Sequence, residues 1–261
     1  MIPKIIHYCW FGDNPLPELA IKCIESWKKY CPDYEIKEWN EKNFNLDVCD
    51  YVREAYDAKK WAFVSDYARL YAIVTEGGIY MDTDVEVLSS LDPYLDNVAF
   101  SGFQSETEIP TGIMACEKGF KLFNELLHDY DTRHFKTGDG DYDTSTNVEA
   151  ITNSCLSKGL KLDNSDQVID GFHLYPKDVF CAKSYHTGII EQTENTVTIH
   201  HFAASWHSWE LDVGTAIRGW FTDRRMGLLG RVLAFPFTFI GRCKLEGSRR
   251  SVKHYLGKFG K

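Results

Sequence analysis

Asp82 and Asp84 follow directly on the short apolar segment Ile79–Met81. In an α/β sheet, ligands bind beyond the carboxyl ends of the strands. Alternate side chains of an extended segment share a face, so both carboxylates can aim at one point. Their mutual repulsion is relieved by a hard divalent cation, Mg²⁺ or Mn²⁺, which can stabilise a departing diphosphate. A surface turn with two solvated acids is the alternative interpretation of the same pattern.

A second charged pair precedes these acids, within the segment Trp61–Glu76, whose apolar spacing predicts a helix. Asp66 and Arg69 are three residues apart and can therefore face the same space. An arginine suits bidentate contacts with a diphosphate, and an aspartate can accept hydrogen bonds from ribose or sugar hydroxyls. An ordinary surface ion pair worth about 0.3 kcal/mol is the alternative.

Taken together, these motifs resemble a known family of enzymes. The segments Ser65–Leu70 and Gly77–Asp84, the opening Ile2–Gly12 and the late segment His200–Trp206 are similar to glycosyltransferase family thirty-two, which has a DXD sugar-binding region. The catalytic domains of clostridial glucosylating toxins are more distantly similar. The resemblance covers about residues 1–210. It implies an α/β fold of the GT-A type, a Rossmann-like nucleotide-sugar fold with a mainly parallel central sheet.

The resemblance also assigns contacts with a nucleotide sugar. Trp10 would stack on the nucleotide base, Asp66 would contact the ribose or the donor sugar, and Arg69 would contact the sugar or the diphosphate. Ser205 and Trp206 would hold the β-phosphate after it departs. Without the resemblance, a core position is the alternative for both tryptophans.

A divalent cation is the second implication of the resemblance. Asp84 would ligate Mn²⁺ or Mg²⁺ directly, and Asp82 would contact the ribose or reach the metal through water. One histidine of the pair His200-His201 would complete the ligand shell. We slightly favour His201, although the phase of the strand leaves both open.

The function implied is retaining, metal-dependent transfer of a hexose or N-acetylhexosamine from a nucleotide sugar. A UDP-sugar is the favoured donor and GDP-mannose the second. The acceptor would be a glycan, most simply a lipid-linked saccharide in surface polysaccharide synthesis. A toxin-like protein glycosyltransferase and a non-catalytic nucleotide-binding scaffold protein are the alternatives.

Local patterns predict the elements that must position these residues. Helices are predicted over Glu18–Tyr30, Val48–Tyr56, Trp61–Glu76, Phe120–Tyr130 and Val148–Lys158. Strands are predicted over Ile2–Trp10, Tyr34–Trp39, Ile79–Met81, Val85–Val87, Val98–Phe103, Ile113–Cys116 and Thr196–His200. Strands that alternate with helices indicate an α/β domain.

Charge is unevenly distributed along the 261 residues, and this predicts two parts. The whole chain carries −9, which does not favour nucleic acid as a partner, and residues 218–261 carry +9. We therefore expect a catalytic domain over 1–217 and a basic, partly apolar extension over 218–261. The apolar run after Arg231 has nine residues, too few to span a bilayer, and fits attachment to an anionic membrane surface. A helical extension packed on the core is the alternative.

Eight cysteines without a C-x-x-C pair predict reduced thiols rather than a zinc site or a disulfide scaffold. The sequence opens directly on an expected strand, without the pattern of a signal peptide. The expected location is therefore cytoplasmic and peripheral, on the inner face of the membrane.

Overall fold

The computed structural model describes residues 1–105, 107–138, 140–185, 187–203, 213–214, 217, 226–248 and 251–252. Its strands are β1 (Ile5–Cys9), β2 (Glu35–Trp39), β3 (Gly78–Met81), β4 (Val85–Val87), β5 (Ala99–Gly102), β6 (Ile113–Cys116), β7 (Gln167–Ile169), β8 (Phe172–Tyr175) and β9 (Thr198–His200). Its helices are α1 (Glu18–Tyr30), α2 (Asp50–Asp57), α3 (Trp61–Glu76), α4 (Lys121–His128), α5 (Asn147–Ser157), α6 (Lys177–Phe180) and α8 (Gly227–Glu246), with short 3₁₀ turns η1 (Asp92–Tyr94) and η2 (Asp129–Thr132). The predicted helices and strands are confirmed to within a few residues, whereas β7, β8 and α6 were not anticipated.

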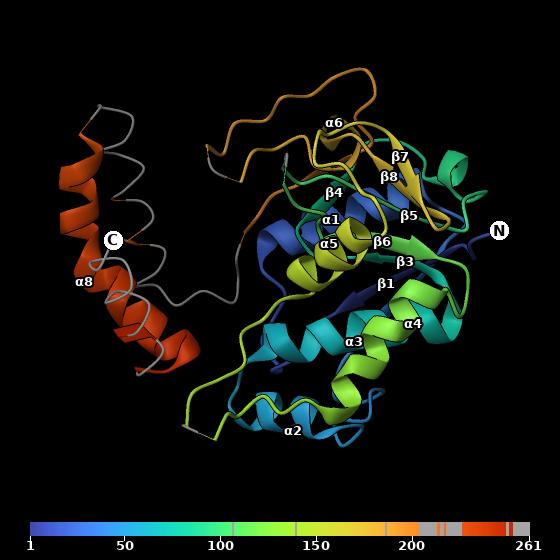
Figure 1. Cartoon of the computed structure of the whole chain (residues 1–261). Helices are drawn as coiled ribbons and strands as arrows, with labels where there is room; N and C mark the ends of the chain where they lie inside the picture. Colours follow the sequence, from blue (N-terminus) through green and yellow to red (C-terminus); the bar gives the residue numbers. More distant parts are fainter. Residues whose placement is uncertain are drawn as a thin grey trace.

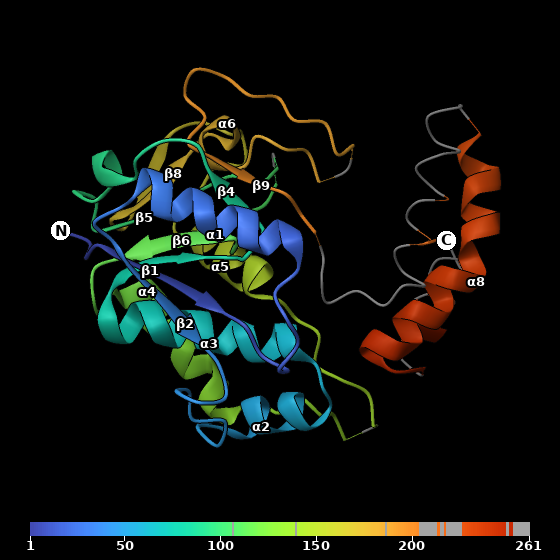
Figure 2. The same ribbon diagram turned by 180° about the vertical axis from the view of Figure 1, so that it is seen from behind.

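Seven strands form the central sheet, in the order β2-β1-β3-β6-β5-β8-β7. β6 is antiparallel to both of its neighbours, and β7 is antiparallel to β8; the remaining pairs are parallel, so five of the seven strands run in one direction. Helices cover both faces of this sheet (Figures 1 and 2). The α/β class with a mainly parallel sheet is thereby confirmed.

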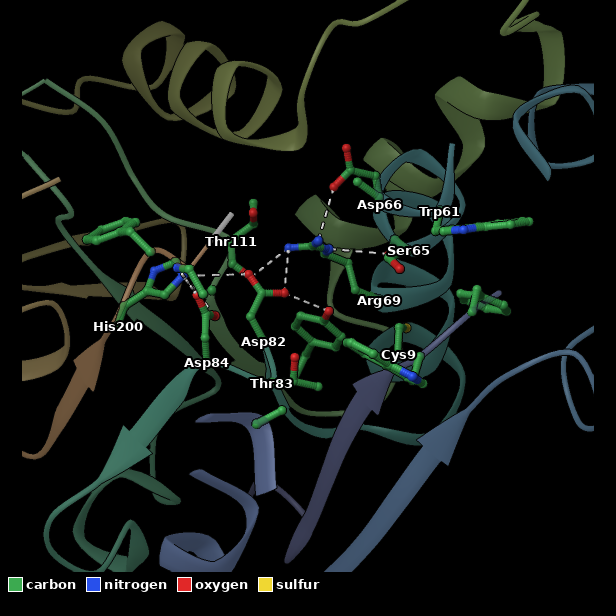
Figure 3. A pocket seen from close by; sticks show the side chains of 18 of the residues that line it. Cys9, Trp61, Ser65, Asp66, Arg69, Asp82, Thr83, Asp84, Thr111 and His200 are labelled. Atoms are coloured by element: carbon green, nitrogen blue, oxygen red, sulfur yellow. Dashed lines mark hydrogen bonds and ion pairs between the residues drawn. The ribbon is translucent and has the colours of Figure 1, made fainter. Parts of the chain in front are cut away.

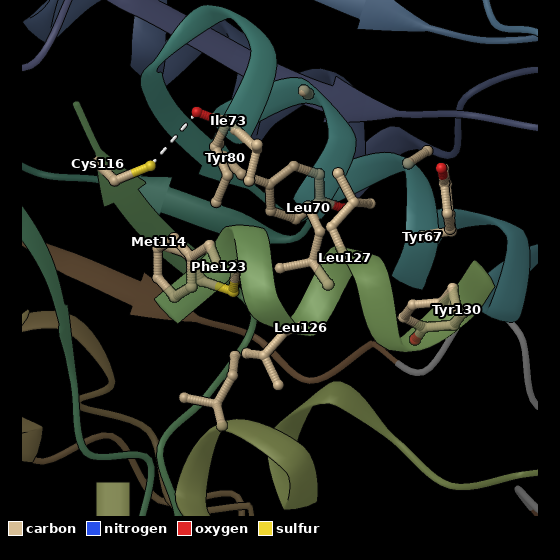
Figure 4. Close-up of a cluster of buried hydrophobic side chains, with 14 of the residues drawn as sticks. Tyr67, Leu70, Ile73, Tyr80, Met114, Cys116, Phe123, Leu126, Leu127 and Tyr130 are labelled. Atoms are coloured by element: carbon tan, nitrogen blue, oxygen red, sulfur yellow. Dashed lines mark hydrogen bonds between the residues drawn. The ribbon is translucent and has the colours of Figure 1, made fainter. Parts of the chain in front are cut away.

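Each face of the sheet has its own apolar core because strand side chains alternate. In β3, Tyr80 faces the core built with α3 and α4, whereas Ile79 and Met81 face the core built with α1. Figure 4 shows the first core, where Leu70 of α3 and Phe123 of α4 are fully buried. A side chain of this size contributes about 2 kcal/mol when it is fully buried. These two cores fix where β1 and β3 end.

The turn between α3 and β3 depends on a glycine. Gly78 has a φ of 106°, and a Cβ built there would lie 2.7 Å from the Ile5 carbonyl oxygen. A glycine is the residue that permits both this conformation and this close approach. The turn therefore seats β3 against β1 and sets the position at which the chain reaches Asp82.

Helix α8 stands apart from the sheet, on the side toward which β1 points (Figure 2). Its carboxyl-terminal end meets the body, where Lys60 Nζ donates to the Lys244 carbonyl oxygen and Leu245 packs against the first core. Each helix in the part of the chain that the structure describes is too short or too polar to cross a bilayer. Residues 218–225 lie outside that part, so a boundary at residue 218 stays a prediction.

Candidate functional site

A cavity of about 750 Å³ lies at the carboxyl ends of β1 and β3. Its lining includes the end of β1, the first turns of α3, the segment after β3 and the end of β9, together with residues before and at the start of α1 and the segment that precedes β6. Figure 3 shows His200 at one end of the cavity, Asp82 and Asp84 beside it, and Trp61 at the opposite end. The position agrees with the rule that ligands bind where strands of an α/β sheet end.

A small second sheet brings the late histidine to the acids. Asp84 directly precedes β4, which pairs antiparallel with β9 so that Val85 lies opposite His200. The Asp82 backbone N–H donates to the Gly112 carbonyl oxygen at 2.8 Å and continues the pairing of β3 with β6. Backbone pairing thus places His200 next to the carboxylates.

Asp82, Asp84 and His200 form a cluster that can hold a metal ion. Each offers one ligand atom, and these atoms lie within 4.8 Å of one another. His200 Nε2 is 3.3 Å from Asp84 Oδ1 and 3.9 Å from Asp82 Oδ2. The expected pair of acids at the end of the third strand therefore converges on a single point.

His201 lies elsewhere, and our preference for it over His200 is corrected. Its Nε2 is 2.9 Å from Glu86 Oε2, on the side of β4 away from the cluster. His200 lies opposite Val85 in the pairing of β9 with β4, and consecutive strand residues point to opposite faces, so the side chain of His201 points away from that of His200.

Charge complementarity holds the cluster together when no cation is bound. Burial lowers the pKa of His200, but the charge and hydrogen bond of Asp84 more than offset this and raise the pKa to about 10. Burial likewise raises the pKa of Asp84, and His200 more than offsets it and lowers the pKa to about 2. At neutral pH the pair is thus an imidazolium and a carboxylate, and a metal ion binding there must displace the imidazolium proton.

The residues of the cluster fit a divalent cation. Two carboxylates with one imidazole form a donor set that suits Mn²⁺ better than Mg²⁺, which prefers oxygen ligands alone. The His200 ring fits here because Gly112 has no side chain: a Cβ at Gly112 would lie 2.6 Å from the Cε1 and Nδ1 atoms of His200.

Arg69 bridges Asp66 of α3 and Asp82, which follows β3. Its Nη2 is 3.3 Å from Asp66 Oδ1, and its Nη1 is 3.4 Å from Asp82 Oδ1 and donates to the Thr111 carbonyl oxygen at 3.0 Å. The guanidinium also lies over the Tyr80 ring and is almost fully buried. Because most of its donors face protein groups, its geometry suits fixing the two carboxylates more than clamping a diphosphate.

Asp66 is buried beside Arg69, and the start of α5 packs against it. Burial raises the pKa of Asp66 to about 6, and Arg69 offsets only part of the rise. Asn147 Nδ2 donates to the Asp66 carbonyl oxygen at 2.6 Å, and Asn147 Oδ1 accepts from the Tyr130 hydroxyl at 2.7 Å. Asn147 does not line the cavity but supports the backbone of Asp66 from α5, a contact that the sequence did not indicate, since an asparagine at a helix start is read as local capping.

The raised pKa of Asp66 predicts a pH-dependent effect of Asp66→Asn on stability. The folded state holds the proton of Asp66 more tightly than the unfolded chain does. The contribution of Asp66 to the free energy of unfolding is therefore fully present below about pH 4 and is lost as the pH rises through about 6. The free energy of unfolding of Asp66→Asn, relative to that of the wild type, should therefore rise by up to about 3 kcal/mol from acidic to neutral pH. Urea unfolding across this range measures the difference.

The matched control is Asp143→Asn. Burial raises the pKa of Asp143, but Ser145 and Arg133 more than offset this, so its pKa is lowered and its pH trend has the opposite sign. A difference between Asp66→Asn and wild type that stays flat with pH would contradict the buried-carboxyl interpretation.

Aromatic residues form the other end of the cavity. Trp10 and Trp61 both line it, and Trp10 Nε1 donates to the Asn14 carbonyl oxygen at 2.6 Å. Trp61 was not anticipated, because in the sequence it reads as the first residue of a helix. Its indole occupies space that Gly12 leaves free, where a Cβ would lie 2.6 Å from Trp61 Nε1. Ser205 and Trp206 lie outside the described residues.

Residues 17–101 match a family model described as a glycosyltransferase sugar-binding region containing a DXD motif. Asp66, Arg69, Asp82 and Asp84 all fall within it. The resemblance to glycosyltransferases with a DXD region is thereby confirmed, and His200 is contributed from outside the region.

Curated relatives match about half of this chain. Inositol phosphoceramide mannosyltransferase 3 of Schizosaccharomyces pombe is 32% identical over 130 residues, which cover 48% of this chain and 36% of that protein. Subversion of eukaryotic traffic protein A of Legionella pneumophila is 29% identical over 160 residues, which cover 48% of this chain and 24% of that protein. The chain thus spans about a third or less of their length.

Among solved structures, a glycosyltransferase involved in the glycosylation of the major capsid of PBCV-1 has a TM-score of 0.42 and 13% identity. The match covers 82% of this chain and all of that one.

Proposed function

We propose that the chain is a metal-dependent glycosyltransferase of the GT-A type. It moves a hexosyl or N-acetylhexosaminyl group from a nucleotide sugar to a glycan acceptor with retention of configuration. The observation that carries this proposal is the convergence of Asp82, Asp84 and His200 within 4.8 Å inside the cavity that the sugar-binding region lines. UDP-sugars remain the favoured donors, and the name of the fission yeast relative gives weight to GDP-mannose as the second.

The side chains divide the work by their positions. Asp84, Asp82 and His200 would hold Mn²⁺, or Mg²⁺ in its place. When bound, such a cation offsets the negative charge that grows on the leaving diphosphate. Arg69 pairs with Asp66 and Asp82 and fixes both carboxylates. Asp66 at the cavity wall accepts hydrogen bonds from hydroxyls of the nucleotide sugar. The leaving phosphate oxygen accepts the proton of the acceptor hydroxyl in this proposal.

Trp10, which lines the cavity, provides an apolar surface for the nucleotide base, and Trp61 lines the end of the cavity opposite His200. Ser205 and Trp206, from the same motif as His200, are proposed to hold the β-phosphate. This arrangement orders base, diphosphate and sugar along a single cavity.

The test is incubation of the full chain with Mn²⁺ and a panel of UDP-sugars and GDP-mannose without acceptor, with release of nucleoside diphosphate as the readout. Slow, Mn²⁺-dependent hydrolysis of one donor is expected. No binding or hydrolysis of any donor would favour the nucleotide-binding scaffold instead.

A toxin-like enzyme with a protein acceptor is the second candidate, because the name of the Legionella relative describes action on eukaryotic traffic. The clostridial toxin domains named above point in the same direction. Transfer of labelled sugar to protein in a lysate, rather than to a lipid extract, would select this alternative.

We further propose that α8 attaches the enzyme to an anionic membrane surface on the cytoplasmic side, where a lipid-linked acceptor would be met. Leu228 and Val232 lie one turn apart on α8 and are 78% and 61% exposed. The surrounding segment 218–261 carries +9, whereas residues 1–217 carry −18. A negative surface would therefore attract the extension and repel the body.

Val232→Glu should weaken binding to vesicles that contain phosphatidylglycerol by about tenfold or more, because a buried valine contributes about 1.5 kcal/mol. Co-sedimentation measures this. The matched control is Val168→Glu on β7, which is 60% exposed on the acidic body and should leave binding unchanged. Equal binding of both variants would contradict the proposed attachment.

A further inference from the structure

The chain makes a left-handed turn immediately after β9. Phe202 has a φ of 52°, a conformation that a bulky side chain rarely adopts and that costs about 1–3 kcal/mol. Asp13, Lys59, Asn164 and Asp170 share this conformation; the short polar side chains of the two aspartates and the asparagine tolerate it, and Lys59 is unbranched and not aromatic. An aromatic residue in this conformation persists because the surrounding contacts compensate for it.

This turn brings two groups into contact with the candidate cation ligands Asp84 and His200. The turn aims the Ala203 N–H at Asp84, whose Oδ2 accepts it at 2.7 Å, while Asp84 Oδ1 faces His200. The Phe202 ring lies against the His200 ring, with centroids 4.1 Å apart and planes tilted by 32°. Phe202 therefore contacts His200 with its ring and orients Asp84 through the N–H of the residue that follows it.

His200 depends on packing for its orientation. A metal-binding histidine is usually fixed by a hydrogen bond from its second ring nitrogen. In His200 that nitrogen, Nδ1, is buried without a well-formed hydrogen bond among the described residues, and the Cys181 side chain is the polar neighbour that acts on the ring besides Asp84. The ring is instead held by Phe202 and by the space left at Gly112.

The Phe202 ring is itself supported from the solvent side. The Tyr185 ring meets it edge-on, with centroids 5.3 Å apart, and both residues line the cavity. A row of three rings, Tyr185, Phe202 and His200, thus leads from the surface to the cluster.

We propose that Phe202 is a positioning residue for the cation site: its ring sets the orientation of His200, and its left-handed turn sets the orientation of Asp84. This inference rests on the proposed function, because it takes the cluster to bind a divalent cation. Phe202 acts through its two neighbours and does not itself touch the cation.

The test is binding of Mn²⁺ alone to the full chain, followed by electron paramagnetic resonance. Phe202→Gly keeps the left-handed turn but removes the ring, and it should weaken Mn²⁺ binding by about 10–100-fold, as loss of a supporting contact does at other metal sites. Phe202→Tyr keeps the ring and should bind as the wild type does. The nitrogen coupling of the His200 imidazole to bound Mn²⁺ should weaken in Phe202→Gly, a signal that a merely structural role would not change.

Two further variants make the outcome decisive. Asp170→Gly makes the same kind of change at a left-handed residue outside the cavity lining and should leave Mn²⁺ binding unaltered. His200→Ala reports the loss of a ligand. If Phe202→Gly binds Mn²⁺ like the wild type while His200→Ala is weakened, Phe202 is not a positioning residue and the cation site stands. If the wild type itself does not bind Mn²⁺, or His200→Ala binds equally well, the cation site and the inference both fail.

Discussion

Asp84→Asn should abolish Mn²⁺-dependent donor hydrolysis, with kcat/KM lowered about a thousandfold or more. The amide has nearly the same shape and can still accept the Ala203 N–H, but it removes the negative charge nearest His200. A divalent cation held by one fewer carboxylate binds less tightly and stabilises the leaving diphosphate less, an effect of about 4 kcal/mol. Release of nucleoside diphosphate at several Mn²⁺ concentrations measures both consequences.

The matched control is Glu86→Gln, two residues further along the chain. Glu86 contacts His201 rather than the cation cluster, so the same exchange of carboxylate for amide should change hydrolysis by less than about twofold. Thermal unfolding of both variants shows whether either has lost its fold. Full activity of Asp84→Asn would remove the metal-dependent mechanism.

Arg69→Met should lower the free energy of unfolding by about 3–5 kcal/mol at neutral pH. The substitution leaves Asp66 and Asp82 facing each other without the buried cation that joins them, and an uncompensated buried charge is costly. The loss should become smaller as the pH falls, because Asp66 then takes up a proton; since Arg69 lowers the pKa of Asp66 in the wild type, the variant takes up this proton at a pH above 6. Urea unfolding at acidic and neutral pH measures both effects.

Two comparisons isolate the cause. Arg53→Met breaks an exposed ion pair with Asp50 and should cost at most about 1 kcal/mol at either pH. The double variant Arg69→Met with Asp66→Asn should recover part of the lost stability, since it removes one of the stranded charges. A loss that is independent of pH and is not recovered would show that Arg69 acts through packing on Tyr80 instead.

Local patterns were sufficient for most of the secondary structure. The helices Glu18–Tyr30 and Trp61–Glu76 match their predicted bounds because each has a clear apolar stripe and an abrupt stop, at Cys31-Pro32 and at Gly77-Gly78. The strands β7 and β8 were missed. They are short and partly exposed, and β7 is a three-residue edge strand without a clear apolar alternation.

The sequence by itself determined that two acids follow a buried strand and that Asp66 and Arg69 share a helix face, since both facts depend on residues a few positions apart. The choice of His200 over His201 was decided by tertiary structure: β9 pairs with β4 so that His200 lies opposite Val85, and the turn before β4 brings the Asp84 carboxylate within 3.3 Å of His200 Nε2. The same holds for the burial of Arg69 between two carboxylates, the wall formed by Trp61 and the contact of Phe202 with His200. The burial of Arg69 and the position of Trp61 depend on packing between elements, and the contact of Phe202 with His200 depends on a local backbone turn. Neither packing nor this turn leaves a pattern in the spacing of residues along the chain.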